Sequence, residues 1–580
     1  MRKLPLWLGM AVLVIICGIS AQVLAVELFP PEEVRPGLRG IGKTVFSGNA
    51  IETFDVEVLG IIPQSPPVSS YIMVKVSGEA IERYGGIARG MSGSPVYIQD
   101  RLLGAISHTY PYTDHRIGLV TPAVDMFRLF DALPTPEPAL PEEVVAVSSP
   151  VIVQGMNERN LSYLVEALGL ERTQVLPSFA AAASSTGAAA FEPGSMVGVQ
   201  LLRGDFVVAT YGTVTHVRED GRFIAMGHPV FHRGAVDFFA SAVYVHQTLS
   251  NLEVPVKIAS LGATVGKVAQ DRAAGVGGVL GTAVGYVPIS ITVTDTERGV
   301  RQSYYVEAVK DEQFLAPLII GSAYQSIDAA LDRIGDGTAY VRVEFVSQDF
   351  GQRMIRENLF YSDSDIAVWC LVDLLSGLEL LLGNNLQAVD LQQVKIEVEV
   401  SRERKTATIE RATPSTSHVR AGDSVDVEVL IRPFRGQVET RTLRLQIPAD
   451  TAAGLLTVTV RSGAEGYYYT KPPVHTSILE PSEEEDAEEP MRAFISDADT
   501  LDDLIEEYMD RERNNELVAE FYPFRENQVE DEAAEDGEEE EAFDPLSYYP
   551  WAEPMDPVMA RLSTQFVLDG MATFDLNIYH

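Results

Sequence analysis

The amino-acid sequence predicts a mainly β protein of several domains: two β-barrels, an immunoglobulin-like β-sandwich and an acidic C-terminal region that is largely disordered. The chain has 580 residues, which is too many for one hydrophobic core. Short β-branched runs broken by Gly, Pro, Asn and Asp fill 37–131 and 196–346, two blocks of comparable size that favour a pair of barrels. Alternating strands over 393–463 favour the sandwich.

The first 25 residues predict export. Arg2 and Lys3 give a short positive region, an apolar run follows from Leu4 to about Ile19, and small residues at 23–25 offer a cleavage site. We therefore assign 1–25 to a signal peptide. The alternative is an uncleaved anchor, because the apolar stretch is nearly long enough to span a bilayer. Either form predicts a periplasmic or extracellular protein, anchored to the membrane at its N-terminus in the second case.

Charge and cysteine content narrow the classes of function. A formal net charge of −39 repels nucleic acid and anionic membrane surfaces, so we set nucleic-acid binding aside. Of the two cysteines, Cys17 falls in the signal segment and Cys370 in an apolar helical stretch at 364–383, where a buried structural thiol is expected. No Cys/His cluster in the sequence has the spacing of a zinc site. We expect no metal and no other cofactor.

The domains follow one another in chain order. A Pro-rich stretch at 133–143 marks the end of the first barrel, and "NERNLSYLVEALGL" at 157–170 predicts one helix in the linker behind it. The apolar helical stretch at 364–383 separates the second barrel from the sandwich. The expected domains are a first barrel at 26–132, a linker with one helix at 133–195, a second barrel at 196–346, a helical connector at 347–392 and the sandwich at 393–475.

Residues 476–555 form an acidic, low-complexity region with too few apolar residues to offset the entropy of ordering it, so we expect it to be dispensable for folding. Within it, "TLDDLIEEYMDRERNNELVAEFY" at 500–522 predicts an amphipathic helix, and "DADTLDD" at 497–503 is typical of a helix N-terminus. Residues 556–580 predict a strand pair. Whether these strands return to an earlier sheet stays open, and such a return would contradict dispensability.

One short stretch suggests chemistry. "ARGMSGSPVYIQDRLLGAISH" at 88–108 contains the pattern Gly-x-Ser-Gly-x-Pro, which begins at Gly90 and has Ser92 at its centre. Acyl transfer needs a nucleophile in a tight turn where backbone N–H groups converge, and glycine permits the close approach. Ser92 is therefore a candidate nucleophile, with the N–H groups of Gly90 and Ser92 as its oxyanion hole. The alternative is a β-turn without chemistry.

The base that activates Ser92 has to be a histidine. His228 ends a strand in "DGRFIAMGHPVF", and such a Gly-His-Pro turn projects an imidazole from a barrel rim. His108 ends the strand that follows Ser92, so we expect it in the wall of the pocket. His216 and His246 lie in strand-like runs, which is typical of structural histidines.

Three segments resemble a known family. "GGIARGMSGSPVYIQDRLLGAISH" and "GTVTHVREDGRFIAMGHPVF" are similar to segments of the SpoIVB peptidase family, serine peptidase family fifty-five, and "LRGIGKTVFSGNAIETFDVEVLGII" resembles bacterial proteins that carry its domain. The resemblance covers roughly 37–131 and 196–300. It implies barrels of the chymotrypsin-like type and a serine endopeptidase with Ser92 as nucleophile and His228 as general base. It also implies action outside the cytoplasmic membrane on a protein or peptide, which in the type member is a membrane-associated partner in signalling.

The chain departs from the family pattern at two points. Here Ser92 precedes His228, whereas the Gly-His element comes first in the type member. Geometry rather than chain order defines a triad, so permuted barrels can still form one site. The second departure concerns the acid, because Ser77 stands where the family carries it. Ser77 can accept a hydrogen bond but brings no charge.

Asp271 is the candidate for the missing acid. It follows His228 by about forty residues, a separation like that between the His and Asp of one chymotrypsin-type barrel, and it precedes a Gly-rich turn. The alternative is a surface ion pair between Asp271 and Arg272. Asp237 and Asp114 are weaker candidates, because the first is too close to His228 and the second lies on a polar loop.

The sequence therefore predicts a secreted or envelope-facing serine endopeptidase that acts through an acyl-enzyme. The alternative is a catalytically inactive envelope scaffold or interaction protein that retains the peptidase fold. The missing acid at Ser77 favours the scaffold, and the intact turn around Ser92 favours the enzyme. A carbohydrate-binding or adhesin-type β protein is a third hypothesis, which rests on the sandwich alone.

Overall fold

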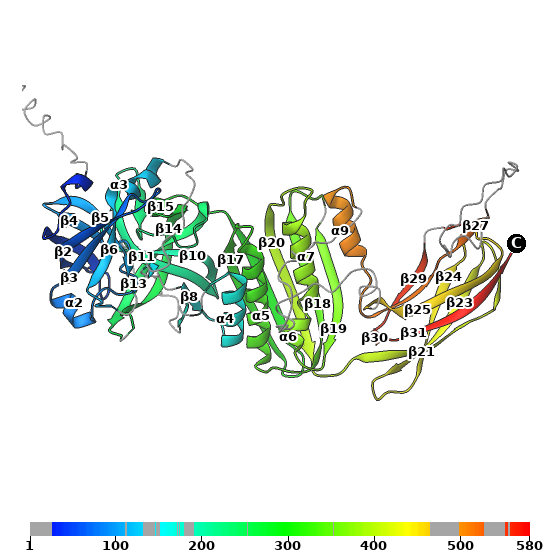
Figure 1. The fold of residues 1–580 in the computed structure, drawn as a ribbon. Helices are drawn as coiled ribbons and strands as arrows, with labels where there is room; N and C mark the ends of the chain where they lie inside the picture. The colour runs from blue at the N-terminus through cyan, green and yellow to red at the C-terminus, as the bar shows by residue number, and fades with distance from the viewer. Residues whose placement is uncertain are drawn as a thin grey trace, which may run out of the picture. The chain divides into compact units, whose positions relative to one another are not determined.

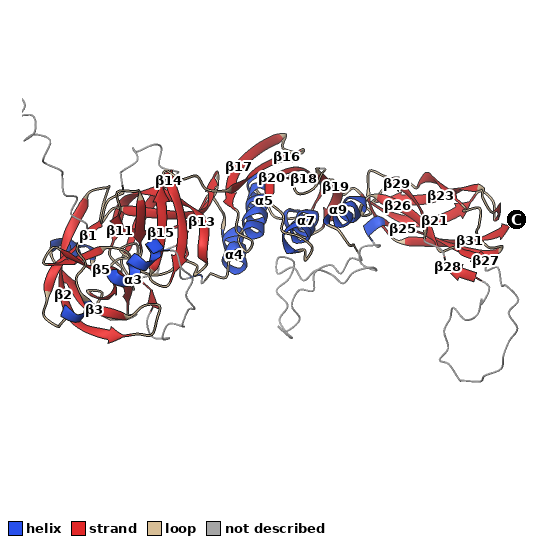
Figure 2. Ribbon diagram, turned by 90° about the horizontal axis from the view of Figure 1, so that it is seen from above, coloured by secondary structure: helices blue, strands red, loops and turns tan. Residues whose placement is uncertain are grey.

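The computed structural model shows two compact units of mainly β structure (Figure 1, Figure 2). The first unit takes the chain up to Gln154, with Glu171–Leu201 and Val207–Gly285, and the second takes Gly155–Leu170, Leu202–Phe206 and Tyr286–His580. The described residues are 26–110, 113–131, 145–146, 151–170, 172, 175–178, 191–251, 253–351, 353–464, 498–526, 552–554 and 557–580. The signal segment at 1–25, the Pro-rich stretch at 133–143 and the acidic runs at 480–490 and 529–543 lie outside them.

The first unit contains a closed six-stranded barrel. Its strands are β1 (Arg39–Val45), β2 (Ile51–Pro63), β3 (Ser70–Ser77), β4 (Pro95–Ile98), β5 (Arg101–Thr109) and β6 (Ile117–Pro122). They pair in the order β4-β1-β2-β3-β6-β5, and β4 pairs with β5 to close the ring. Alternation explains the strands: Phe54, Val56 and Val58 of β2 face the core with Val74 and Val76 of β3, while their neighbours are more exposed. The predicted mainly β class with a barrel is confirmed.

A second ring of strands completes the first unit. It consists of β10 (Met196–Gly204), β11 (Val207–Val217), β12 (Arg222–Ala225), β13 (Gly234–Leu249), β14 (Val256–Arg272) and β15 (Gly275–Leu280). The pairing order β10-β13-β14-β15-β12-β11 returns to its start because β10 also pairs with β11. Two short strands extend it beyond β11: β8 (Val151–Gln154) and β9 (Val175–Ser178). The sequence predicts that this barrel continues to residue 346. The structure corrects this, because the first unit ends at Gly285.

Residues 286–401 instead build a mixed sheet with helices in the second unit (Figure 1). Its strands are β16 (Tyr286–Asp295), β17 (Val300–Val309), β18 (Gly337–Ser347), β19 (Met354–Ser362) and β20 (Leu391–Ser401), and its helices are α4 (Glu158–Ala167), α5 (Leu315–Leu331), α6 (Ile366–Trp369) and α7 (Val372–Gly383). β16 pairs in parallel with β20 about a hundred residues later, and α5 packs on β16 and β17. The predicted helical connector is thus part of a layered α/β structure, because parallel strands need a long crossover.

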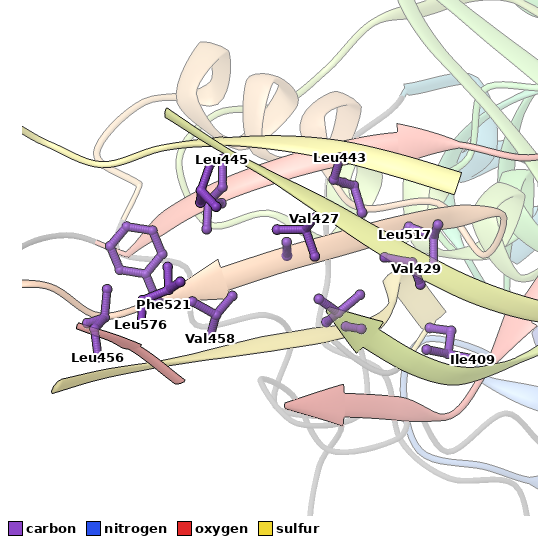
Figure 3. Packing of buried hydrophobic residues seen from close by; sticks show 14 of the residues in the cluster. Ile409, Val427, Val429, Leu443, Leu445, Leu456, Val458, Leu517, Phe521 and Leu576 are labelled. Atoms are coloured by element: carbon purple, nitrogen blue, oxygen red, sulfur yellow. The ribbon is translucent and has the colours of Figure 1, made fainter. Parts of the chain in front are cut away.

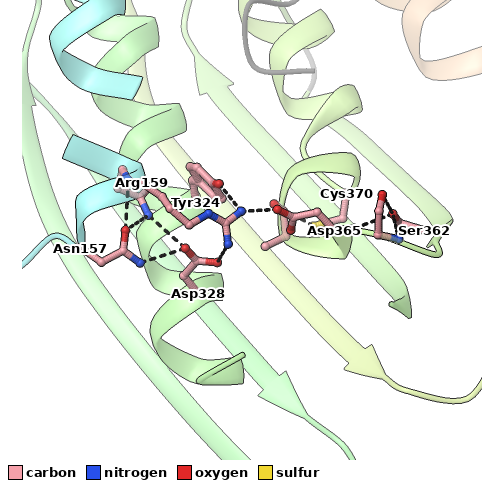
Figure 4. Close-up of polar contacts among 10 residues, drawn as sticks. Asn157, Arg159, Tyr324, Asp328, Ser362, Asp365 and Cys370 are labelled. Carbon is pink, nitrogen blue, oxygen red and sulfur yellow. Dashed lines mark hydrogen bonds and ion pairs between the residues drawn. The ribbon is translucent and has the colours of Figure 1, made fainter. Parts of the chain in front are cut away.

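A polar cluster joins the helices of this layer (Figure 4). Asn157 Nδ2 donates to Asp328 at 2.9 Å, Arg159 lies 3.4 Å from the same carboxylate, and Arg159 also pairs with Asp365. Cys370 directly follows α6 and is fully buried, and burial raises the pKa of its thiol well above the ordinary value. The prediction of a buried structural thiol is confirmed.

The rest of the second unit is a β-sandwich. One sheet has the order β24-β23-β21-β30 and the other β22-β31-β25-β26-β29. The strands are β21 (Thr406–Pro414), β22 (His418–Arg420), β23 (Ser424–Pro433), β24 (Glu439–Gln446), β25 (Gly454–Ser462), β26 (Glu516–Phe521), β29 (Val558–Ser563), β30 (Val567–Asp569) and β31 (Met571–Tyr579), with the small pair β27 (Phe524–Glu526) and β28 (Ala552–Pro554) beside them. Figure 3 shows the apolar side chains between the sheets. The immunoglobulin-like topology stays a prediction, and β21–β30 and β22–β31 are parallel pairs.

In the C-terminal region the predicted helix is confirmed in part, and the strand pairing argues against the predicted dispensability for folding. The predicted helix at 500–522 is α9 (Leu501–Asp510) followed by the strand β26, because the capping box of Thr500 and Asp503 starts a helix whose apolar pattern lasts three turns. The region is also not simply a dispensable tail: β26 and β31 are the two neighbours of β25 in the sandwich. Both strands therefore depend on residues 454–462 for backbone pairing, and their buried side chains belong to the sandwich core.

Candidate active site

The Ser92 turn is a compact loop that glycine makes possible. Gly90 and Gly93 both have φ of +92°, a backbone region that residues with side chains rarely adopt. The N–H of Met91 donates to Ala88 O at 2.9 Å, and the N–H of Ser94 donates to Met91 O at 2.9 Å. These bonds fold the chain tightly around Ser92, as the sequence motif predicts.

Neighbouring strands approach this turn so closely that Gly93 cannot be replaced. A Cβ atom on Gly93 would lie 1.9 Å from the carbonyl oxygen of Thr213 and 2.4 Å from the backbone nitrogen of Met226. The N–H of Gly93 donates to Ile106 O at 2.7 Å, and Thr215 Oγ1 donates to Gly93 O at 2.8 Å. The second ring of strands therefore supports the nucleophile turn of the first barrel.

The backbone of Gly90 suits the predicted oxyanion hole. Its carbonyl oxygen accepts hydrogen bonds from Thr213 Oγ1 at 3.0 Å and from Lys257 Nζ at 3.2 Å. Its N–H meets no hydrogen-bond acceptor within the described part of the chain. A carbonyl fixed on one side and a donor left available on the other is the arrangement that a developing oxyanion requires.

His228 sits on a turn with unusual backbone angles. β12 ends at Ala225, and the next two residues, Met226 and Gly227, have φ of +68° and +72°. Left-handed conformation at a buried methionine is costly and persists only where the surroundings impose it. Nδ1 of His228 lies 2.6 Å from the carbonyl oxygen of Pro229, which can only accept. Nδ1 therefore carries the proton, and in the neutral form of the ring Nε2 presents its lone pair, as a general base must.

Strand β5 brings the two turns together. Ile106 accepts the hydrogen bond from Gly93, and the next residue, Ser107, contacts Gly227, where an added Cβ would lie 3.1 Å from Ser107 Cβ. The following residue, His108, has its ring centroid 6.0 Å from that of His228. Three consecutive residues of one strand thus touch the serine turn, the histidine turn and the histidine itself.

The site is closed in this structure. Ser92 has no exposed surface, and His228 is 2% exposed. A Cβ on Gly212 of β11 would lie 3.1 Å from Ser92 Oγ, so the strand runs directly against the hydroxyl. A substrate reaches Ser92 only after some of this cover moves.

Asp271 is bonded to the backbone of the loop that follows His228. Its carboxylate accepts the backbone N–H groups of Val230 at 2.7 Å, Phe231 at 2.8 Å and Arg233 at 3.3 Å. Burial raises the pKa of Asp271, and the three N–H donors oppose that rise. The carboxylate is thus tied to the segment that follows His228, whereas Nδ1 of His228 bonds to Pro229. Whether Asp271 serves catalysis stays a prediction.

The other predicted residues divide between the site and the surface. His108 belongs to the site: burial, with a smaller contribution from His228, lowers its pKa to about 3, so the ring is neutral at physiological pH. Ser77 is exposed at the end of β3, opposite Asp55, and is not brought to Ser92. Asp114 forms an exposed ion pair with Arg116.

Sequence reasoning missed Lys257, whose Nζ lies beneath Gly90. The signal was an inverted alternation in "VKIAS" at 256–260. Lys257 and Ala259 face the interior of the ring, and Ile258 is 38% exposed. A strand that presents a lysine to the core and an isoleucine to solvent indicates that the lysine has a partner inside.

Comparison with known proteins identifies the segment that carries Ser92. Residues 21–120 match the family model described as SpoIVB peptidase S55. No curated protein and no solved structure matches the chain. The matched segment includes Gly90, Ser92 and His108 and ends before His228. Residues 21–120 of this chain are therefore similar to the SpoIVB peptidase S55 family, and the match covers less than half of the chain.

Proposed function

We propose that the chain is a serine endopeptidase that cleaves a protein or peptide substrate through an acyl-enzyme. One observation carries the proposal: the turn that bears the family's serine and the turn that bears His228 pack on adjacent residues of β5, Ile106 and Ser107. Fold stability alone does not explain why a tight glycine turn and a histidine with its proton on Nδ1 pack against the same strand.

The proposed reaction uses four groups. Ser92 Oγ attacks the carbonyl carbon of the peptide while Nε2 of His228 accepts the hydroxyl proton. The oxyanion receives hydrogen bonds from the N–H groups of Gly90 and Ser92. His228 then returns the proton to the leaving amine, and a water molecule activated by the same ring hydrolyses the acyl-enzyme.

Asp271 has an indirect part in this mechanism. By holding the N–H groups of Val230, Phe231 and Arg233, it fixes the loop that begins at His228 and so orients the imidazole through the backbone. Pro229 O takes the position on Nδ1 that a carboxylate occupies in the well-studied triads. A carbonyl fixes the tautomer but stabilises the imidazolium less than a carboxylate does, so we expect modest turnover.

The proposed place of action is outside the cytoplasm, in the periplasm or the extracellular space. The positive and apolar segment at the N-terminus supports export. A substrate held at a membrane fits this location, and a role in signalling follows the resemblance to the family's type member.

A catalytically inactive scaffold is the second candidate. The complete burial of Ser92 and the carbonyl rather than carboxylate on His228 Nδ1 favour it. A fluorophosphonate probe separates the two, because it forms a Ser92 O–P bond with loss of fluoride only when the serine is activated and reachable.

The experiment compares labelling of the folded full chain with that of three variants. We expect the wild type to be labelled, and Ser92→Ala and His228→Ala to lose the label. Ser77→Ala is the matched control, since Ser77 is more exposed than Ser92 but lies elsewhere on the barrel. No label on the wild type, or equal label on Ser92→Ala, favours the scaffold.

A further inference from the structure

Lys257 is a buried lysine that the proposed mechanism does not use. It has no exposed surface, and its Nζ lies 2.8 Å from Thr44 Oγ1, 3.2 Å from Gly90 O and 3.3 Å from Met196 Sδ. Among the described residues, no carboxylate contacts the amine, so it is not half of an ion pair. Burial lowers the pKa of Lys257 to about 7, since an apolar environment disfavours the charged form. Burying an amine without a charged partner costs free energy of folding. The N–H groups of Lys257 act here as hydrogen-bond donors to Thr44 and Gly90.

Those donors and the backbone of Lys257 reach both peptide planes that meet at Gly90. In the plane before Gly90, the amide N–H of Lys257 donates to Arg89 O at 3.2 Å. One plane earlier, the N–H of Arg89 donates to Pro255 O at 2.7 Å. In the plane after Gly90, Lys257 Nζ lies 3.2 Å from Gly90 O. With both planes anchored to one residue, φ and ψ of Gly90 are set.

This anchoring determines the direction of the Gly90 N–H. In a trans peptide the C=O and the N–H point in opposite directions. Because Arg89 O faces the amide of Lys257 on β14, the N–H of Gly90 points away from that strand. Its lack of an acceptor in the described part of the chain agrees with a donor held ready for a ligand.

The side chain of Lys257 also shapes the space around the turn. A Cβ on Gly90 would lie 3.3 Å from Lys257 Cδ and 2.7 Å from the ring of Tyr211, so only glycine fits. The hydroxyl of Tyr211 in turn donates to Lys257 O. The methylene groups of Lys257, the ring of Tyr211 and Gly90 therefore pack against one another next to the Ser92 turn.

We propose that Lys257 is a positioning residue of the oxyanion hole, which fixes Gly90 so that its N–H faces the carbonyl that Ser92 attacks. This inference rests on the peptidase function proposed above. Lys257 acts through Gly90 and does not touch the substrate. A hydrogen-bond donor to the oxyanion has to be held in position before the reaction begins. The turn formed by Gly90, Met91 and Ser92 is too short and too flexible to fix that position without contacts from other strands.

The test is Lys257→Met in the full chain. Methionine retains the length of the stem and removes the donors. We expect kcat on a cleavable peptide to fall by about 100-fold with KM within about threefold, as for loss of an oxyanion-hole donor. Hydrogen exchange of the peptide that covers Ala88–Ser94, measured by mass spectrometry, should become faster. The matched control is Lys267→Met, which removes a half-buried lysine of the same strand that pairs with Asp237.

A second variant keeps the test decisive if Lys257→Met does not fold. Thr213→Val removes the other donor to Gly90 O and leaves the lysine in place. We expect a smaller fall in kcat with the same unchanged KM. Unchanged kcat and unchanged exchange in a folded Lys257→Met overturn the proposal. If the wild type neither hydrolyses nor labels, the peptidase function fails, and exchange at Ala88–Ser94 decides by itself whether Lys257 anchors the turn.

Discussion

The core of the barrels and the core of the sandwich differ in chemistry. Between the sheets of the sandwich, the buried cluster consists of aliphatic side chains and one phenylalanine, Phe521 (Figure 3). In the first unit, Ser92, His108, Lys257 and Asp271 are all buried, each at 1% exposure or less. Burying polar and ionisable groups costs free energy that an apolar core avoids.

This contrast points to the ring of strands around Ser92, and not to the sandwich, as the part of the molecule that serves function. The cluster between the sheets of the sandwich is apolar, and β23 alternates without exception, with Val425, Val427, Val429 and Ile431 buried. The buried Arg461 at the end of β25 is paired with Glu512 and Glu520. The ring around Ser92 departs from such regularity at Lys257 and at Met226, with its φ of +68°. Clustered exceptions of this kind are typical of functional sites.

Deleting residues 557–580 should produce the largest effect and break the sandwich alone. The deletion removes β31, which pairs with β25 from Gly454↔Ile578 to Arg461↔Met571, together with the buried side chains of Leu568 and Leu576. We expect calorimetry to lose the transition of the sandwich, while Ser92 labelling persists in the first unit. An unchanged melting profile would mean that the C-terminal region is dispensable after all.

Asp271→Asn should affect the barrels without altering the sandwich. The amide has the shape of the carboxylate, but its NH₂ cannot accept from the backbone of Val230 or Phe231, so the loop behind His228 loosens. We expect peptide hydrolysis to fall by about tenfold or more, yet by less than the about 10⁴-fold that follows loss of a directly bonded acid. If the rate stays within about threefold while His228→Ala abolishes it, Asp271 does not orient the histidine.

Leu445→Ala tests the apolar half of the comparison. Leu445 is fully buried between the sheets, and its loss leaves a cavity. The expected cost is about 2–5 kcal/mol of the free energy of unfolding of the sandwich, measured in urea. Ser92 labelling and kcat should not change. A fall in kcat would instead show that the sandwich supports the site.

The smallest expected effect is a dependence of the stability of the first unit on pH, which His108 produces. The pKa of His108 is about 3 in the folded chain, against an ordinary value of 6.5, so the unfolded chain binds more protons between these two values. Stability is therefore present above about pH 6.5 and is lost as the pH falls toward 3. At pH 5 the contribution of His108 to this loss is about 2 kcal/mol, and His108→Gln should remove that contribution.

Much of the fold and part of the site could be predicted from local sequence. The alternation of β2 and β3 predicts strands with one buried face, and Thr500 followed by Asp503 predicts the start of α9. The motif at Gly90–Pro95 predicts a tight turn because its glycines occupy backbone angles that other residues avoid. These features depend on neighbours within a few residues, so the sequence alone carries them.

Pairings between distant strands could not be predicted in this way. A strand pattern has a period of two wherever it occurs, so nothing in "VPISITVTD" indicates that β16 pairs in parallel with β20 rather than closing a barrel. The same limit hid the return of β31 to β25. Which edges meet is decided by the apolar area that the whole arrangement buries, and that is a property of the folded chain.

The site shows the same division. Local sequence was enough to predict the serine turn and to single out His228, because a glycine-rich loop and a Gly-His-Pro turn involve only neighbouring residues. Folding placed both turns on β5, tied Asp271 to the backbone behind His228 and set Lys257 under Gly90, 167 residues away in the chain. No local pattern carries these contacts, because hydrogen bonds and burial act over a few ångströms of space, whatever the separation along the sequence.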